Sequence, residues 1–296
     1  MTSLAALLPH FPPVDFAMGY GSAVFQQAGH DDSTSMIDLV LAVEDPLAWH
    51  TEHLQRHPEH YSGIKLFGPK AIVYVQEHFG AGCYYNTLVP VPGSSQLMKY
   101  GVVKTSTLCH ELTDWPTLYL SGRMHKPVNI FKTNVEIDKA ASINLTNALH
   151  LAILGLPETF TEEQLFMKIA GISYWGDFRM VFGENPKKVR NIVHGSMEKF
   201  RKLYQNKIDV MLRQLRTRPH PCPMLLGLPH NITSRLSEKA KVKLTLSPNG
   251  KKLKHAVSAV VGQYSRTQSI KGIATAGALK TMVYIWQKLS RTYLRK

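Results

Sequence analysis

The residues of this chain that are best suited to carry chemistry lie between positions 19 and 43. Gly21 and Ser22 form a small polar turn, and Asp38 is the one charged residue in the apolar run 36–43 (MIDLVLAV). Glycine lets the backbone approach a triphosphate, and a serine hydroxyl with nearby amides binds phosphate oxygens. A carboxylate on a strand can hold Mg²⁺ beside them. The pattern therefore predicts a phosphate and metal site; a glycine turn before a core strand with one hydrogen-bonded Asp is the alternative.

The segments around these residues have the character of a mixed α/β domain. Residues 36–43 read as a buried strand, and Pro46 stands near the first position of a following helix. Residues 92–95 (PGSS) mark the turn of a hairpin. Further strands are predicted at 71–75, 83–91, 97–104 and 128–131.

The sequence favours helices after Asn134. Residues 140–154 are good helix formers, and Thr161 with Gln164 predicts a capping box for a helix that stops near Gly171. Asn185 and Pro186 predict the start of another helix. The expected fold is α/β (α+β): a mixed α/β domain over 1–134, a helical, winged-helix-like domain over 135–221, and a basic C-terminal region over 222–296.

The charge of +14 is concentrated near the C-terminus. Residues 237–296 carry 13 lysines and arginines against one acid, Glu238, so this region should meet an anionic partner. No apolar run approaches the roughly 18 to 20 residues of a membrane span. The three scattered cysteines suggest neither zinc nor a disulfide framework.

A helix over about 276–296 is predicted to be amphipathic. At 100° per residue its apolar and aromatic side chains share one face, with basic side chains on another. This composition is typical of a helix lying in an anionic lipid interface, although a helix docked on the protein's own core fits as well. The expected membrane contacts are Leu279, Met282, Trp286, Lys288 and Arg291.

The Gly-Ser turn, short helix and strand aspartate resemble the polymerase-β-like nucleotidyltransferases. Longer segments are similar to the mitochondrial phosphatidate cytidylyltransferases (the translocator assembly and maintenance family). They run in one order from about Gly19 to Trp286: GYGSAVFQQAG, HYSGIKLFGPK, GAGCYYN, KYGVV, LYLSGRMHKPV, AGISYWGDFRM and SIKGIATAG. One departure concerns the second strand carboxylate of the superfamily, because Met36 and Val40 occupy the positions two residues from Asp38.

The resemblance implies the reaction of CTP with phosphatidic acid to give CDP-diacylglycerol and pyrophosphate, with Mg²⁺. It implies a peripheral protein on the matrix side of the mitochondrial inner membrane, in phospholipid and cardiolipin synthesis. Gly21, Ser22 and Asp38 match the triphosphate and metal motif, and Glu111 is the candidate for the missing carboxylate; an exposed helix-start acid is the alternative for Glu111. Lys99 is a candidate catalytic residue, and the candidate nucleotide-binding residues are Lys65, Lys70, Asn86, Tyr100, Arg123 and Lys126.

Other residues favour structural roles. Asp177 and Arg179 are expected to form an internal ion pair, and the histidines at 50, 53, 57 and 60 read as a solvated helix face. Two other functions remain open on the sequence alone. One is an RNA-directed nucleotidyltransferase with a basic RNA-binding tail, although no aromatic stacking platform is visible and no nucleic-acid partner is expected. The other is a non-enzymatic, membrane-associated assembly factor.

Overall fold

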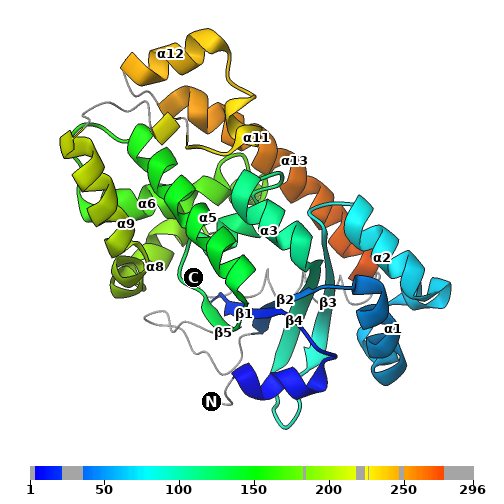
Figure 1. The fold of residues 1–296 in the computed structure, drawn as a ribbon. Coiled ribbons are helices and arrows are strands. Elements are labelled where there is room, and N and C mark those ends of the chain that lie inside the picture. The colour runs from blue at the N-terminus through cyan, green and yellow to red at the C-terminus, as the bar shows by residue number, and fades with distance from the viewer. Residues whose placement is uncertain are drawn as a thin grey trace.

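A mixed sheet lies beside a larger group of helices (Figure 1). The structure is a computed structural model that describes residues 4–21, 36–182, 185–217, 224–225, 227–246 and 250–276. Its sheet has the order β3-β4-β2-β1-β5. The strands are β1 (Phe16–Tyr20), β2 (Ile37–Val43), β3 (Cys83–Pro90), β4 (Leu97–Lys104) and β5 (Asn129–Lys132).

Strand β2 lies at the centre of the sheet and pairs with β4 in parallel and with β1 antiparallel. The β3–β4 and β1–β5 pairs are antiparallel. Every residue of β2 is buried except Asp38, which is half-buried, so the prediction of a buried strand is confirmed. The hairpin between β3 and β4 is confirmed too.

The helices of the first half pack on the sheet or next to it. Asp45 begins α1, because its carboxylate accepts hydrogen bonds from the amides of Leu47 and Ala48 at 2.8 and 3.0 Å. The elements are η1 (Leu4–His10), α1 (Pro46–Arg56), η3 (Pro58–His60), η4 (Gly63–Phe67), α2 (Gly68–His78), α3 (Thr105–Asp114) and α4 (Ser121–Met124).

The helices of the second half build the largest apolar core. Thr161 and Gln164 form the predicted capping box, and the helix that they begin ends at Gly171. The elements are α5 (Val135–Leu154), α6 (Glu162–Gly171), η5 (Ile172–Tyr174), α7 (Arg179–Phe182), α8 (Lys188–His194), α9 (Met197–Thr217), α11 (His230–Thr233), α12 (Glu238–Leu246) and α13 (Gly250–Ala276).

The two faces of the sheet carry different cores. On one face, Val40 and Ala42 of β2 pack with residues of α3, α4 and α5, such as Leu112. On the other face, Leu39 and Leu41 pack with residues of η1 and α1. Because successive side chains of a strand point to opposite faces, Asp38 shares the face that α3, α4 and α5 cover.

Helix α13 connects the helical core to the edge of the sheet. Its first half packs in the helical core through Leu253 and Val257, and Figure 1 shows its far end beside α2. There Gln268 accepts a hydrogen bond from the amide of Ala81 at 2.8 Å, and Lys271 donates to the carbonyl oxygens of Gln76 and Phe79. The basic C-terminal region is therefore part of the packed structure as far as α13.

Two predictions about the first half are wrong. Residues 71–75 (AIVYV) lie inside α2 and form no strand. The face of α1 that bears His50 and His53 is buried and not solvated, because these rings bond to Tyr61, Gln76 and Tyr100. The winged-helix composition is not confirmed, since the described residues beyond Lys132 contain no strand for a wing.

Candidate active site

Gly21 directly follows the end of β1, and Asp38 lies near the start of the neighbouring strand β2. Gly21 follows β1 with φ of 85°, a conformation that side-chain-bearing residues rarely adopt. A Cβ atom at this position would lie 3.4 Å from Oδ2 of Asp38. The backbone bend therefore runs directly against the carboxylate, and the phosphate-binding and metal-binding roles of these residues stay predictions. Ser22 lies outside the described residues.

Two cations on the same face are held by tyrosine rings. Lys99 of β4 is the register partner of Asp38, and its Nζ lies 4.7 Å from the centre of the Tyr85 ring. Arg123 of α4 lies over two rings, with its guanidinium carbon 3.9 Å from Tyr119 and 5.1 Å from Tyr20. These are cation–π contacts, which attract a cation without neutralising it.

Arg179 is a third cation of this cluster, and an ion pair with the buried Asp177 fixes its position. Its guanidinium binds both carboxylate oxygens of Asp177, at 2.6 to 3.1 Å. The residue before this aspartate, Gly176, has φ of 79°, and a Cβ atom there would collide with the backbone of Ser258 in α13. The predicted ion pair is confirmed, and α13 supports the segment that carries it.

The protonation behaviour of the tyrosines shows that these charges converge. Burial alone would raise the pKa of Tyr119, yet its pKa is lowered because Arg123, Lys99 and Arg179 stabilise the phenolate. Burial raises the pKa of Tyr20 to about 12, with Arg123 opposing and the carboxylate of Asp38 reinforcing that rise. Three cations and one carboxylate therefore act on one small volume, which is electrostatically suited to a polyanion.

Lys126 lies at the border between the sheet domain and the helical half. Its ammonium group donates to the carbonyl of Gly122 and, at 2.8 Å, to Oγ of Ser173. Burial, together with the nearby positive charges of Arg123 and Lys188, lowers its pKa to about 7. An amine with this pKa is partly neutral at physiological pH. The contacts of Lys126 therefore favour a structural role, in which it links α4 to η5, over a role in binding an anionic ligand.

Glu111, the expected second metal ligand, is fully occupied by protein donors. Its carboxylate accepts hydrogen bonds from the amides of Thr117, Tyr119, Leu120 and Ser121 at 2.7 to 3.4 Å, and from Oγ of Ser121 at 3.0 Å. Burial raises its pKa, and these hydrogen bonds act against that rise. The contacts favour a role in holding the loop before α4, which carries Arg123, over the expected metal ligation.

Four other candidates do not join this cluster. Tyr100 belongs to the core on the opposite face of the sheet, where its hydroxyl accepts a hydrogen bond from Asn86 at 2.8 Å. Lys65 lies in η4, with its Nζ bonded to the carbonyl of Pro58, and Lys70 is exposed on α2. The five residues expected at the membrane, from Leu279 to Arg291, lie outside the described residues.

Sequence reasoning missed the three tyrosines at 20, 85 and 119 that position the cations. One signal was available for Tyr20, which directly precedes Gly21. Strand alternation also predicts that Tyr85, two residues from buried Cys83, shares its face. Nothing in the sequence indicates that Tyr119 comes to the same place.

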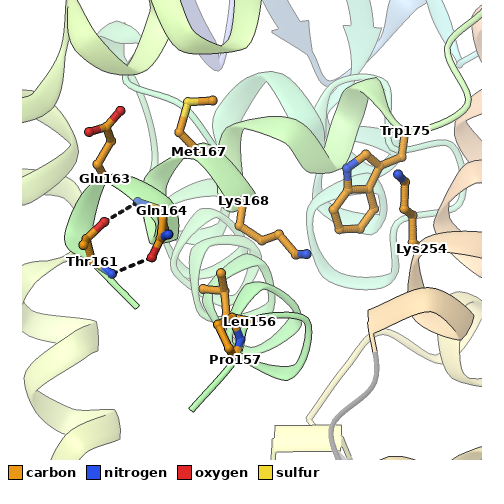
Figure 2. Close-up of a pocket in the computed structure, with 9 residues that line it drawn as sticks. All are labelled: Leu156, Pro157, Thr161, Glu163, Gln164, Met167, Lys168, Trp175 and Lys254. Carbon is orange, nitrogen blue, oxygen red and sulfur yellow. Dashed lines mark hydrogen bonds between the residues drawn. The ribbon is translucent and has the colours of Figure 1, made fainter. Parts of the chain in front are cut away.

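A hollow of about 600 Å³ opens elsewhere, between α6 and α13 (Figure 2). Lys168 and Lys254 extend into it beside the indole of Trp175, and Leu156 and Met167 form an apolar wall. No residue of the Asp38 cluster lines this hollow. Volume alone therefore does not identify the reactive centre of this protein.

The residues around Asp38 fit Mg²⁺ only together with a phosphate ligand. In the part of the chain that the structure describes, the group of three metal-ligating side chains that lie close enough to share an ion is His57, Glu59 and His60, and Asp38 is not in it. Mg²⁺, however, binds through one or two carboxylates, substrate phosphates and water. Asp38 beside the Gly21 bend offers one such carboxylate.

The fold and the site define an α/β protein in which a glycine bend, a carboxylate and three cations lie close together. The family model for mitochondrial phosphatidate cytidylyltransferase matches residues 4–222 and 221–291. The chain is 40% identical to the mitochondrial phosphatidate cytidylyltransferase of Danio rerio, covering 95% of this chain and 92% of the relative. The Xenopus laevis enzyme of that name is 41% identical (96% and 92% covered), and the Schizosaccharomyces pombe enzyme is 38% identical (96% and 81%). The chain belongs to the mitochondrial phosphatidate cytidylyltransferase family.

Proposed function

We propose that this protein is a CTP-dependent nucleotidyltransferase that converts phosphatidic acid to CDP-diacylglycerol with release of pyrophosphate. The observation that carries the proposal is the convergence of Lys99, Arg123 and Arg179 on the face of the sheet where Gly21 meets Asp38. Membership of the family, with relatives named for this activity, supports the same reaction. It also disfavours the RNA-directed and the non-enzymatic alternatives.

The reaction requires positioning and charge neutralisation more than proton transfer. A phosphate oxygen of the lipid forms a bond to the α-phosphorus of CTP while the bond from that phosphorus to the pyrophosphate oxygen breaks. The nucleophile is already anionic and needs no strong base, so the barrier falls chiefly through alignment and electrostatic stabilisation. Lys99, Arg123 and Arg179 are suited to bind the triphosphate and the charge that develops on pyrophosphate.

Asp38 would hold Mg²⁺, which supplies charge neutralisation on the leaving pyrophosphate. The Gly21 bend would receive the triphosphate, with Ser22 as a further phosphate ligand. Glu111 and Lys126 act as positioning residues, because their contacts hold the loop and the helix that present Arg123.

The site of action would be the matrix side of the mitochondrial inner membrane, where the protein serves phospholipid and cardiolipin synthesis. The relatives' names contain the word mitochondrial. Among the described helices, none combines the length and the hydropathy needed to cross a bilayer. Peripheral attachment through the amphipathic segment 276–296 would bring the protein to its lipid substrate.

The experiment that tests this function offers two acceptors side by side. Purified protein with CTP and Mg²⁺ is given vesicles containing phosphatidic acid or an RNA 3′ end, and pyrophosphate and CDP-diacylglycerol are measured. We expect turnover with the lipid only, and its loss in Asp38→Ala with an unchanged circular dichroism spectrum. Turnover with RNA and none with lipid would refute the proposal.

A further inference from the structure

One surface of the protein, here called the α2 surface, exposes large apolar side chains on η4 and on one side of α2. Leu66 is 83% exposed and Phe67 77% exposed, more than any other large apolar residue that the structure describes. Further along the chain, Tyr74 is 56% exposed and Phe79 is 52% exposed. Single exposed apolar residues are common, but four within 14 positions of the chain call for an explanation.

The backbone beneath this surface is firmly held. Ile64 packs against the cluster of Tyr61, Ile72 and Tyr84 behind the loop. Gly68 turns the chain from η4 into α2 with φ of 76°. Leu66 and Phe67 therefore project from a supported turn, and their exposure is built into the fold.

The polar groups next to Leu66 and Phe67 are basic, whereas Glu77 is an exposed acid nearer to Phe79. Phe67, Lys70, Tyr74 and His78 follow one another at helical spacing along the exposed side of α2, and the Tyr74 and His78 rings lie 4.4 Å apart. From 61 to 72 the chain contains two lysines, Lys65 and Lys70, and no acid. Aliphatic and aromatic residues at the tip, with lysines and a tyrosine around them, match the composition of an interfacial membrane contact.

The end of α13 lies next to this surface. Oγ of Ser62 donates to the carbonyl of Thr275, and Nζ of Lys271 donates to the carbonyl of Phe79 at 2.7 Å. The described part of α13 thus ends beside η4 and α2, and residues 277–296, which contain five lysines and arginines, follow it in the sequence.

We propose that the α2 surface is a second membrane contact, in which Leu66 and Phe67 insert into an anionic bilayer while Lys65 and Lys70 bind lipid phosphates. This proposal rests on the proposed function for its choice of partner, since that reaction draws its substrate from a bilayer. It also gives a role to the two lysines that the structure separates from Asp38. We expect the binding free energy of this contact to add to that of the proposed C-terminal membrane contact, because both would bind the same membrane.

The test is co-sedimentation of the full chain with vesicles of phosphatidylcholine and phosphatidic acid. We expect Leu66→Ser combined with Phe67→Ser to weaken binding about 10- to 100-fold, since two apolar side chains lose burial in the lipid. Val135→Ser combined with Ile143→Ser is the matched control, because these exposed apolar residues lie on α5, and it should bind like the parent. Equal binding by the two double variants would overturn the proposal.

A second measurement separates this surface from catalysis. The Leu66/Phe67 variant should lose turnover on vesicles but retain parental kcat with a water-soluble, short-chain phosphatidic acid. Equal loss on both substrates would show that these residues serve the reaction centre, and would overturn a membrane role. If the proposed function itself is wrong, neither the parent protein nor the variants turn over either lipid. The difference in vesicle binding between the two double variants still tests the α2 surface in that case.

Discussion

At the scale of single residues, two cations of the site lie against aromatic rings, Arg123 over Tyr119 and Tyr20 and Lys99 over Tyr85, and these contacts attract a cation without neutralising it. Carboxylates lie beside the other partners of the cluster, because Asp38 is the register partner of Lys99 and Asp177 pairs with Arg179. Arg123, Lys99 and Arg179 outweigh burial and lower the pKa of Tyr119, in keeping with a positive field at this site. The same field would attract the phosphates of a nucleotide.

Lys99 provides the clearest test of which cations bind CTP. We predict that Lys99→Met raises the KM for CTP about 10- to 100-fold, because a charge-assisted phosphate contact is lost. Lys70→Met is the matched control, since Lys70 is exposed on α2 and outside the Asp38 cluster. Steady-state kinetics at saturating lipid measures both, and equal KM values for the two variants would exclude this binding site.

Glu111 distinguishes a loop-holding carboxylate from a metal ligand. Glu111→Gln replaces an acceptor oxygen with an amide nitrogen among backbone donors, so we predict a loss of about 2–4 kcal/mol in unfolding free energy. The Mg²⁺ concentration for half-maximal activity should stay unchanged. Chemical denaturation and a Mg²⁺ titration test this, and a large rise in the Mg²⁺ requirement without loss of stability would restore the metal role.

At the scale of elements, the clearest case is the far end of α13, which fastens the helical half to the sheet. Gln268 bonds to the amide of Ala81 at 2.8 Å and to the carbonyl of Cys83 at 3.1 Å. We predict that Gln268→Ala lowers the unfolding free energy by about 2–3 kcal/mol, because two buried backbone groups lose their partner. Thr267→Ala, on the exposed side of α13, should cost less than about 0.5 kcal/mol; similar losses in both would contradict this role.

The elements also show how far the sequence could predict this fold. The capping box at Thr161 and the apolar run of β2 are local signals, and both gave the correct element. The β-branched and aromatic composition of residues 71–75 is typical of a strand, but these residues form part of helix α2. Pro69 lies at the start of that helix, and Ile72 and Gln76 are buried on one side of it. Tertiary packing decided that segment, and composition could not reveal it.

The candidate site was predictable to the extent that its residues are close in sequence or share a strand pattern. Gly21, Asp38 and Lys99 were predicted site residues, and the structure places them close together. Strand alternation applied to β4 would have separated Lys99 from Tyr100. The partners of Glu111 and the position of Arg179 depend on contacts between distant elements. The burial of His50 likewise depends on Tyr61 and Gln76, which follow 11 and 26 residues later.

At the scale of the whole molecule, buried neutral histidines should make stability depend on pH. Burial lowers the pKa of His50 to about 4 and that of His125 to about 3. Burial also lowers the pKa of His53 and of His150. As the pH falls below about 6.5, the unfolded chain binds protons on these histidines that the folded protein does not, and each such histidine lowers stability by about 1.4 kcal/mol per pH unit. His50→Gln should therefore reduce the slope by about 1.4 kcal/mol per pH unit in denaturant titrations between about pH 6.5 and 4.5; an unchanged slope would contradict the assignment.

The membrane attachment of the whole chain is predicted to depend on its C-terminal segment. Deleting Ala276–Lys296 removes several basic and aromatic side chains, so binding to anionic vesicles should fall at least about 10-fold. Sedimentation at low and high salt measures the loss and its electrostatic part. Unchanged binding of the truncated chain would remove this segment from the membrane contact.

A structure of the protein with Mg²⁺ and a non-hydrolysable CTP analogue tests the central claim most directly. The predicted result has the triphosphate against the Gly21 bend, among Lys99, Arg123 and Arg179, with the metal ion bound to Asp38. A nucleotide seated in the hollow between α6 and α13, or on the Tyr100 face of the sheet, would contradict it.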